Sequence, residues 1–216
     1  MVRESAVLEG IRFATSVVSD PSGTMNLWKT ATGGKVVGCI PGTPVPELLN
    51  AAGLLPITLE SPEVRSLVSG HIDAWLVGTD PAPFSVPSEG RPRFTFPCMS
   101  PGSLEEALDQ VEGLAEWAYA VSGSPASEGA LWRSLRAYAE RQWLLDALEE
   151  RLAGDPAFLT PGEHRDIVRA GIFLPPEAHS RLLTSILSVD HAPAVLPAEG
   201  EKGDPLIVLA RRLVNR

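Results

Sequence analysis

The sequence predicts an α/β protein in which a parallel, Rossmann-like (flavodoxin-like) sheet is followed by a helical C-terminal layer. Between residues 35 and 96, short apolar segments alternate with helix-forming segments, which is typical of parallel strands buried on both faces. From residue 103 onward, apolar residues recur every three or four positions, which is the helical period. With 216 residues, 44% of them hydrophobic, the chain can bury such a core.

The N-terminal half is expected to alternate between helices and strands. A first helix over residues 3–18 carries one apolar face, and Asp20 with the Pro-Ser-Gly after it is expected to end that helix. Gly53 favours the left-handed conformation that commonly follows a helix. The apolar face of the first helix contains Val7, Leu8, Ile11, Ala14, Val17 and Val18; strands are predicted at 35–40, 54–59, 74–77 and 94–96, and helices at 45–52 and 62–70.

The C-terminal half is predicted to contain four helices. Ser103 and Glu106 have the spacing of a capping box, and this helix should end near Gly123. Ser124 and Pro125 are expected to open a longer helix that closes at residues 154–156. The apolar residues assigned to that long helix are Leu131, Leu135, Tyr138, Leu145, Leu148 and Leu152.

The last two helices begin at clear start signals. Thr160 and Glu163 form a second capping box with Pro161 at the first helical position, and Pro175 opens the final helix. We therefore predict one α/β domain with a helical C-terminal part over residues 1–190. Residues 191–216 are predicted to be a linker rich in proline, glycine and charge, followed by a lone apolar strand.

Net charge excludes two classes of partner. The chain has 18 basic and 27 acidic residues and a net charge of −9, with no block of five or six basic residues. Such a chain repels phosphate backbones and anionic lipid surfaces. We therefore expect no nucleic-acid and no membrane partner, and the absence of an apolar leader after Met1 indicates a cytoplasmic protein.

The two cysteines, Cys39 and Cys98, are too few for a disulfide scaffold or a complete zinc site. Buried free thiols are the simplest interpretation. No P-loop, dinucleotide-binding glycine motif, nucleophile elbow or zinc-protease motif occurs. A hydrolase is therefore disfavoured, because the sequence shows no nucleophile and base pair.

Candidate site residues follow the first three predicted strands, because ligands of open parallel sheets bind outside the carboxyl ends of the strands. Gly42, Thr43 and Pro44 form a turn before a helix that could face an anion or a carbonyl oxygen. Thr79 and Asp80 end the third strand; Asp80 could orient a hydroxyl or act as a base, or simply cap a turn before proline.

Ser61 and Arg65 could add a hydroxyl and a cation to the same mouth, or serve as a helix cap and a solvated charge. His71 and Asp73 are interpreted as a surface pair, and His164 and His179 as residues on helix exteriors. The five tryptophans are expected to pack in the core: Trp28, Trp75, Trp117, Trp132 and Trp143.

Residues 36–56 resemble the opening signature of the 2-hydroxyacyl-CoA dehydratase and benzoyl-CoA reductase subunits, the 2-hydroxyglutaryl-CoA dehydratase D-component superfamily. The matching pattern is a strand, a turn with Pro46 and Glu47, and then Ala51, Ala52 and Gly53. Residues 125–145, with Arg141, are similar to the long helix of the family, and residues 159–163 to a helix start that follows it. The resemblance covers the family's N-terminal domain, over residues 36–190.

Family members hold a 4Fe–4S cluster with cysteines from loops after successive strands and transfer an electron to a bound acyl-CoA. The three matching positions here are Pro41, Ser61 and Thr79, with Cys39 two residues before the first. A cluster needs several thiolates. The resemblance therefore implies a subunit without a cofactor of its own and without a metal site, for which Cys39 is the only candidate ligand.

The function implied is that of a cluster-free subunit of a 2-hydroxyacyl-CoA dehydratase or benzoyl-CoA reductase type of enzyme. Its expected ligand is an acyl-CoA and its expected partner is a related subunit, in a homo- or heterodimer. The expected ligand cleft is formed by Gly42, Thr43, Pro44, Glu47, Ser61, Arg65, Thr79 and Asp80. The alternative is a non-catalytic scaffold or interaction module that binds a small anion.

Overall fold

The computed structural model describes residues 5–41, 45–78, 90–96 and 103–188. Backbone contacts divide the chain into two compact units. The described parts of the first are residues 5–24 and 135–188, and those of the second are residues 25–41, 45–78, 90–96 and 103–134. The single domain expected at 1–190 stays a prediction, and the linker and strand expected at 191–216 lie outside the described residues.

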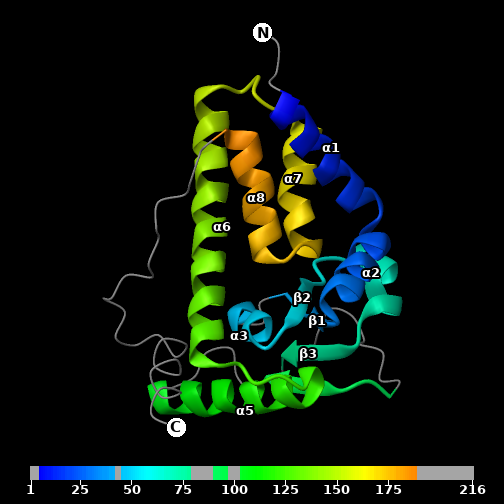
Figure 1. Cartoon of the computed structure of the whole chain (residues 1–216), viewed down its shortest axis with the longest axis vertical. Helices are drawn as coiled ribbons and strands as arrows, with labels where there is room; N and C mark the ends of the chain where they lie inside the picture. Colours follow the sequence, from blue (N-terminus) through cyan, green and yellow to red (C-terminus); the bar gives the residue numbers. More distant parts are fainter. Residues whose placement is uncertain (1–4, 42–44, 79–89, 97–102, 189–216) are drawn as a thin grey trace. The chain divides into compact units, whose positions relative to one another are not determined.

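The second unit contains the predicted parallel sheet, which confirms the α/β fold class. Four parallel strands lie in the order β2-β1-β3-β4 (Figure 1). The strands are β1 (Lys35–Cys39), β2 (Leu54–Thr58), β3 (Ala74–Gly78) and β4 (Arg93–Phe96). The order 2-1-3-4 is that of flavodoxin-like sheets, in which the direction of strand addition reverses between β1 and β3.

Burial follows the place of each strand in the sheet. Four of the five residues of β1 and four of the five of β3 are buried, because both strands are central. The outer strand β4 buries only Phe96. Pro56 is tolerated in β2 because an edge strand needs fewer ladder donors.

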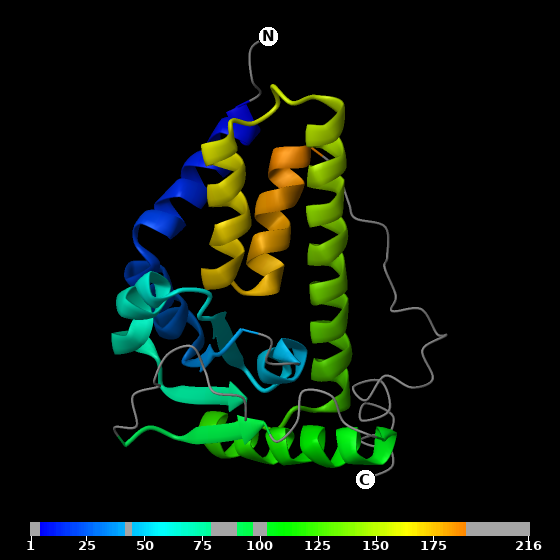
Figure 2. The same cartoon turned by 180° about the vertical axis from the view of Figure 1, so that it is seen from behind.

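Helices cover both faces of this sheet. Crossovers between parallel strands are right-handed, so α3 (Pro46–Ala51) and α4 (Pro62–Val68), which lead in opposite directions along the sheet, lie on opposite faces. Helix α5 (Leu104–Ser122) contacts both α3 and β4, where Trp117 packs on Phe94 with ring centroids 5.7 Å apart. In Figure 2, which views the molecule from behind, α5 lies alongside β4.

One close approach fixes the centre of the sheet. Gly38 of β1 lies under the Trp75 ring of β3, and a Cβ atom at position 38 would be 2.7 Å from Trp75 Cζ3. Real Cβ atoms do not come that close, so only glycine leaves room for the indole. Trp75 is fully buried, as predicted; the other four tryptophans are only partly buried.

The first unit is helical. Helix α1 (Ser5–Ser19) packs on α7 (Pro161–Phe173) and α8 (Pro176–Leu187), and α7 packs on α8. The C-terminal part of α6 (Glu128–Gly154) runs beside α8 in both Figure 1 and Figure 2. Gly10 of α1 packs against Ile186 of α8. A Cβ atom at position 10 would lie 2.7 Å from Ile186 Cγ1, so a larger residue would clash there.

Several residues that were predicted to start or end a helix do so in the structure. The Ser103 hydroxyl accepts a hydrogen bond from Glu106 N at 3.1 Å, and Thr160 and Glu163 form the complete capping box. Gly53 and Gly123 have φ angles of 76° and 77°, the left-handed conformation expected after α3 and α5.

Three predictions about helices were wrong. Helix α2 (Pro21–Thr32) was not predicted, although Asp20 accepts a hydrogen bond from Gly23 N and Pro21 stands at the first position. The long helix starts at Glu128, and Ser127 caps it in place of Ser124. Its buried face contains Leu144, where the sequence analysis assigned Leu145.

His179 was also placed wrongly, since it is buried and not on a helix exterior. Only 1% of its surface is exposed, and its Nε2 donates to the carbonyl of Ile167 at 2.9 Å. Its Nδ1 has no partner, and the Gly171 backbone closes over the ring. Burial, together with the charge of Arg141, lowers the pKa of His179 to about 4. His164, in contrast, is half-exposed and pairs with Glu149 at 2.7 Å.

We predict that acid weakens the fold through His179. The pKa falls from 6.5 in the unfolded chain to about 4 in the folded one, so the unfolded state takes up the proton first. The neutral His179 side chain therefore makes its full contribution to the free energy of unfolding above pH 6.5. This contribution, about 3 kcal/mol in all, is lost as pH falls toward 4. The measurement is urea unfolding of wild type and His179→Gln from pH 7 to pH 4.

The free energy of unfolding should fall more steeply with acid in wild type than in His179→Gln, which has no group to protonate at this position. His164→Gln is the matched control, because it removes an imidazole from a half-exposed position and keeps His179, so its free energy of unfolding should still fall more steeply with acid than that of His179→Gln. If the free energy of unfolding fell equally steeply with acid in wild type and in His179→Gln, this would contradict the assignment of the acid sensitivity to His179.

Candidate functional site

The carboxyl ends of β1 and β3 lie side by side. The ligand crevice was expected outside these strand ends. Cys39 pairs with Leu76 in register, and Ile40 N donates to Leu76 O at 3.1 Å. In flavodoxin-like sheets this reversal point between the first and third strands is where ligands bind. The predicted residues Gly42, Thr43, Pro44, Thr79 and Asp80 lie outside the described residues.

The backbone is strained where the chain enters α3. Val45 has φ 69° and ψ 48°, a left-handed conformation that β-branched residues rarely adopt. Such strain costs of order 1–3 kcal/mol and is found where function or surrounding structure requires it. Val45 follows β1 at the reversal point and directly precedes the Pro46 and Glu47 turn.

Glu47 lies in the first turn of α3, and its carbonyl accepts a hydrogen bond from the buried Ser134 hydroxyl at 2.7 Å. This bond attaches α3 to the start of α6. Helix α3 has only six residues, fewer than predicted for residues 45–52, and the dipole at its N-terminus is correspondingly small.

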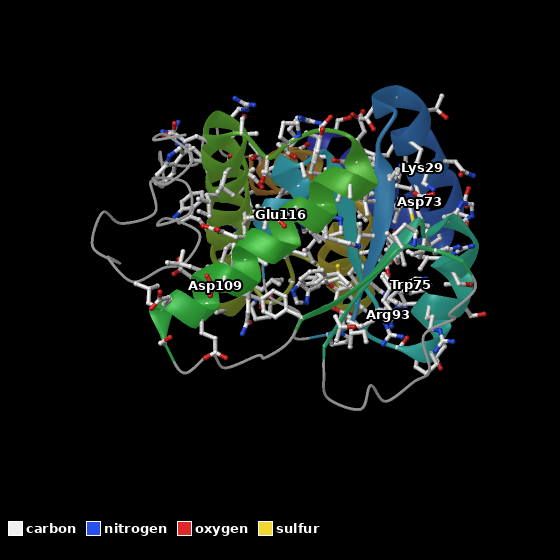
Figure 3. The ribbon with its side chains drawn as sticks, turned by 90° about the horizontal axis from the view of Figure 1, so that it is seen from below. Lys29, Asp73, Trp75, Arg93, Asp109 and Glu116 are labelled. Carbon is white, nitrogen blue, oxygen red and sulfur yellow. The ribbon has the colours of Figure 1, made fainter. Side chains whose placement is uncertain are left out.

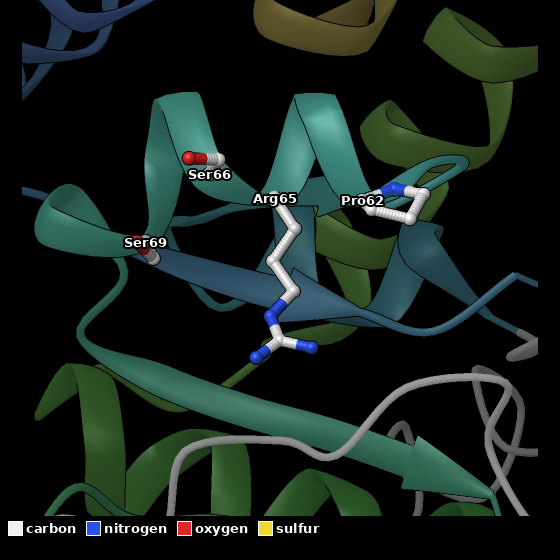
Figure 4. A pocket seen from close by; sticks show the side chains of 4 residues that line it. All are labelled: Pro62, Arg65, Ser66 and Ser69. Carbon is white, nitrogen blue, oxygen red and sulfur yellow. The ribbon is translucent and has the colours of Figure 1, made fainter.

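Ser61 and Arg65 lie on α4, on the opposite face of the sheet from Glu47. The Ser61 hydroxyl accepts from Val64 N at 3.2 Å, so it is the N-cap of α4, which was one of its two predicted roles. Arg65 lines an open cavity of about 400 Å³ together with Pro62, Ser66 and Ser69 (Figure 4). The structure thus joins Ser61 and Arg65 through one helix and separates both from Glu47.

The sequence analysis missed the serines of this cavity. Pro62, Arg65, Ser66 and Ser69 have the spacing i, i+3, i+4 and i+7, which puts them on one face of α4. That spacing was readable from the sequence, but nothing local indicated that the face borders a cavity. At the C-terminal end of α4, Arg91 Nη1 donates to the Ser69 carbonyl at 2.6 Å.

Cys39 does not have the environment of a metal ligand. Its side chain is buried, and burial raises the pKa of the thiol to about 12, so it carries its proton at neutral pH. The Ser61 oxygen at the second matching position caps a helix. These described residues therefore do not fit a 4Fe–4S cluster, which requires thiolates. Within the described ranges no three His, Cys, Asp or Glu side chains gather as a metal-binding group.

His71 and Asp73 were expected to form a surface pair, but in the structure each has its own partners. His71 Nδ1 lies 3.1 Å from Asn26 Oδ1. Asp73 Oδ2 accepts from Val36 N and from Lys29 Nζ, both at 2.7 Å (Figure 3). These groups stand at the amino ends of β1 and β3, away from the crevice.

No family model matches the chain, and no curated protein matches it. Of the helices that the structure describes, none combines the length and the apolar character needed to cross a membrane.

We predict an inverted order of stability for substitutions at Val45. Glycine has no Cβ to clash in the left-handed conformation, so Val45→Gly should be more stable than Val45→Ala by about 1 kcal/mol. At the exposed helical Val168, the same pair should show the ordinary order, with Ala more stable than Gly by about 1 kcal/mol. Urea unfolding of the four variants checks this, and Ala exceeding Gly at both positions would contradict the strain at Val45.

Proposed function

We propose that the chain is an acyl-CoA-binding subunit of the 2-hydroxyacyl-CoA dehydratase and benzoyl-CoA reductase type, without an iron–sulfur cluster of its own. One observation carries the proposal: the segment resembling the family signature forms β1, the strained Val45 turn and α3, at the strand reversal of a parallel sheet. That is where an open sheet of this order holds its ligand.

The chemistry of the described residues supports a binding role over redox catalysis. Cys39 is a protonated, buried thiol, and Ser61 stands where the family has a cysteine. A subunit of this kind contributes a pocket or a partner surface, while the electron transfer belongs to a related subunit that does carry a cluster. The expected partner is therefore a related chain in a homo- or heterodimer.

The competing function is a scaffold or interaction module that binds a small anion. The cavity beside Arg65 favours it, because a guanidinium and serine hydroxyls bind anions without any thioester chemistry. The two functions differ in one respect that can be measured. The first requires recognition of an acyl-CoA, whereas the second requires only the anion.

We predict that the purified protein binds a short-chain 2-hydroxyacyl-CoA. Titration calorimetry of the full chain should give saturable binding to this thioester and none to the free 2-hydroxy acid, because most of the recognised groups belong to the CoA portion. Binding of inorganic anions with no binding of the thioester would contradict the proposal and favour the anion-binding module.

The cluster-free part is tested on protein purified anaerobically, by iron and acid-labile sulfide analysis with an absorption spectrum. Wild type, Cys39→Ala and the matched variant Cys98→Ala should all be colourless and free of iron. A stoichiometric cluster that disappears in Cys39→Ala alone would contradict it and restore a redox role.

A further inference from the structure

The geometry points to a phosphate-binding groove on the α4 side of the sheet, and we propose that it takes the diphosphate of a nucleotide-type ligand. The groove is the cavity of about 400 Å³ lined by Pro62, Arg65, Ser66 and Ser69. Its size lies within the range of small-ligand sites. Naming the ligand as an acyl-CoA rests on the proposed function, whereas the phosphate chemistry does not.

The donors of the groove come from one face of α4 and its C-cap, and Arg91 from the segment before β4 holds the backbone at that C-cap. Arg65 and Ser69 are one turn apart on α4, about 6 Å along the helix axis. Arg91 is fixed at the Ser69 end by its hydrogen bond to the Ser69 carbonyl. Figure 4 shows Arg65 extending from α4 between Pro62 and Ser69. One guanidinium group and two hydroxyls thus border the cavity, and a guanidinium group binds phosphate oxygens through paired hydrogen bonds.

The neighbouring strand continues this positive surface. Arg93 of β4 pairs in register with Trp75 of β3, so both side chains point to the same face of the sheet (Figure 3). This is also the face of Gly38, because Gly38 pairs with Trp75 from the other side. Arg93 is exposed, so the surface of β4 next to the α4 face carries an accessible cation.

A buried donor without a partner lies on this same face. Trp75 is 1% exposed and its indole Nε1 has no hydrogen-bond partner. The Cε3–Cζ3 edge of the indole rests on Gly38 of β1, so Nε1, at the opposite edge of the ring, faces away from Gly38. An unpaired buried donor costs about 1–3 kcal/mol.

The positive charge on the α4 side of the sheet contrasts with the acidic residues on the opposite face. The chain has a net charge of −9, and α5 on the opposite face carries five acidic residues and no basic residue. Asp109 and Glu116 of that helix are seen in Figure 3. On α4, Glu63 lies on the face of Leu67, about 160° from Arg65 around the helix axis. None of the four residues that line the groove is acidic, so an anion there meets no carboxylate of the lining.

The test is titration calorimetry of the full chain with inorganic pyrophosphate at low ionic strength. Wild type should bind saturably, and Arg65→Gln should weaken binding by about tenfold, the usual effect of losing a charge-assisted hydrogen bond. Ser66→Ala should weaken it severalfold. Arg136→Gln is the control with the same loss of charge, because Arg136 is exposed on α6 outside the groove, and it should bind as wild type does.

Equal affinity of wild type, Arg65→Gln and Arg136→Gln, or no pyrophosphate binding by a folded wild type, would overturn the groove. Thermal unfolding of each variant shows whether it is folded.

Competition between pyrophosphate and acyl-CoA separates this proposal from the proposed function. An acyl-CoA that binds Arg65→Gln as tightly as wild type and is not displaced by pyrophosphate leaves the function standing and overturns acyl-CoA as the ligand of the groove. Pyrophosphate binding that needs Arg65, without acyl-CoA binding, supports the groove and contradicts the function.

Discussion

The Asp73 carboxylate is the constraint on which the sheet depends. One of its oxygens accepts from the Val36 amide of β1 and from the Lys29 ammonium of α2, both at 2.7 Å, while the Asp73 amide donates to the Val36 carbonyl at 2.8 Å. Lys29 also donates to the His71 carbonyl. A single residue therefore joins α2, β1 and the entry to β3. Charge-assisted bonds of this kind are the stronger ones in a protein.

This attachment sets the register of β1 against β3, and the register has consequences at the other end of the strands. Gly38 comes under Trp75, and Ile40 comes beside Leu76. A slip by one residue would put a side chain where the indole lies and turn the buried residues outward. The same register brings the strained Val45 turn to the reversal point and leaves the α4 face, with its arginine and serines, beside β4.

Much of the fold could be predicted because its signals are local. Ser61, Ser103 and Thr160 each mark a helix start by accepting a bond from an amide three residues on. Gly53 and Gly123 mark helix ends through their φ angles. Runs of buried residues at β1 and β3 identify central parallel strands without any knowledge of the rest of the chain.

What could not be predicted depends on contacts distant in sequence. His179 looks like a surface residue on its own helix, and only the Ile167 carbonyl and the Gly171 backbone of α7 make it a buried one. The Arg65 face of α4 borders a cavity, and Arg91, 26 positions later, donates to the Ser69 carbonyl; the local sequence of α4 indicates neither. Helix α2 is a different case, since Asp20 and Pro21 are a local start signal that was interpreted only as a stop.

The measurement that tests this account most directly is amide hydrogen exchange by NMR on wild type and Asp73→Ala. The Ile40 amide bonds to Leu76 O, and the Leu59 amide bonds to Cys39 O. In wild type both should exchange slowly, at rates near those of global unfolding. In Asp73→Ala the Ile40 amide should lose more protection than amides of α7, which belong to the other compact unit. A rapidly exchanging Ile40 amide in wild type would contradict the pairing of β1 with β3 and, with it, the position of the candidate site.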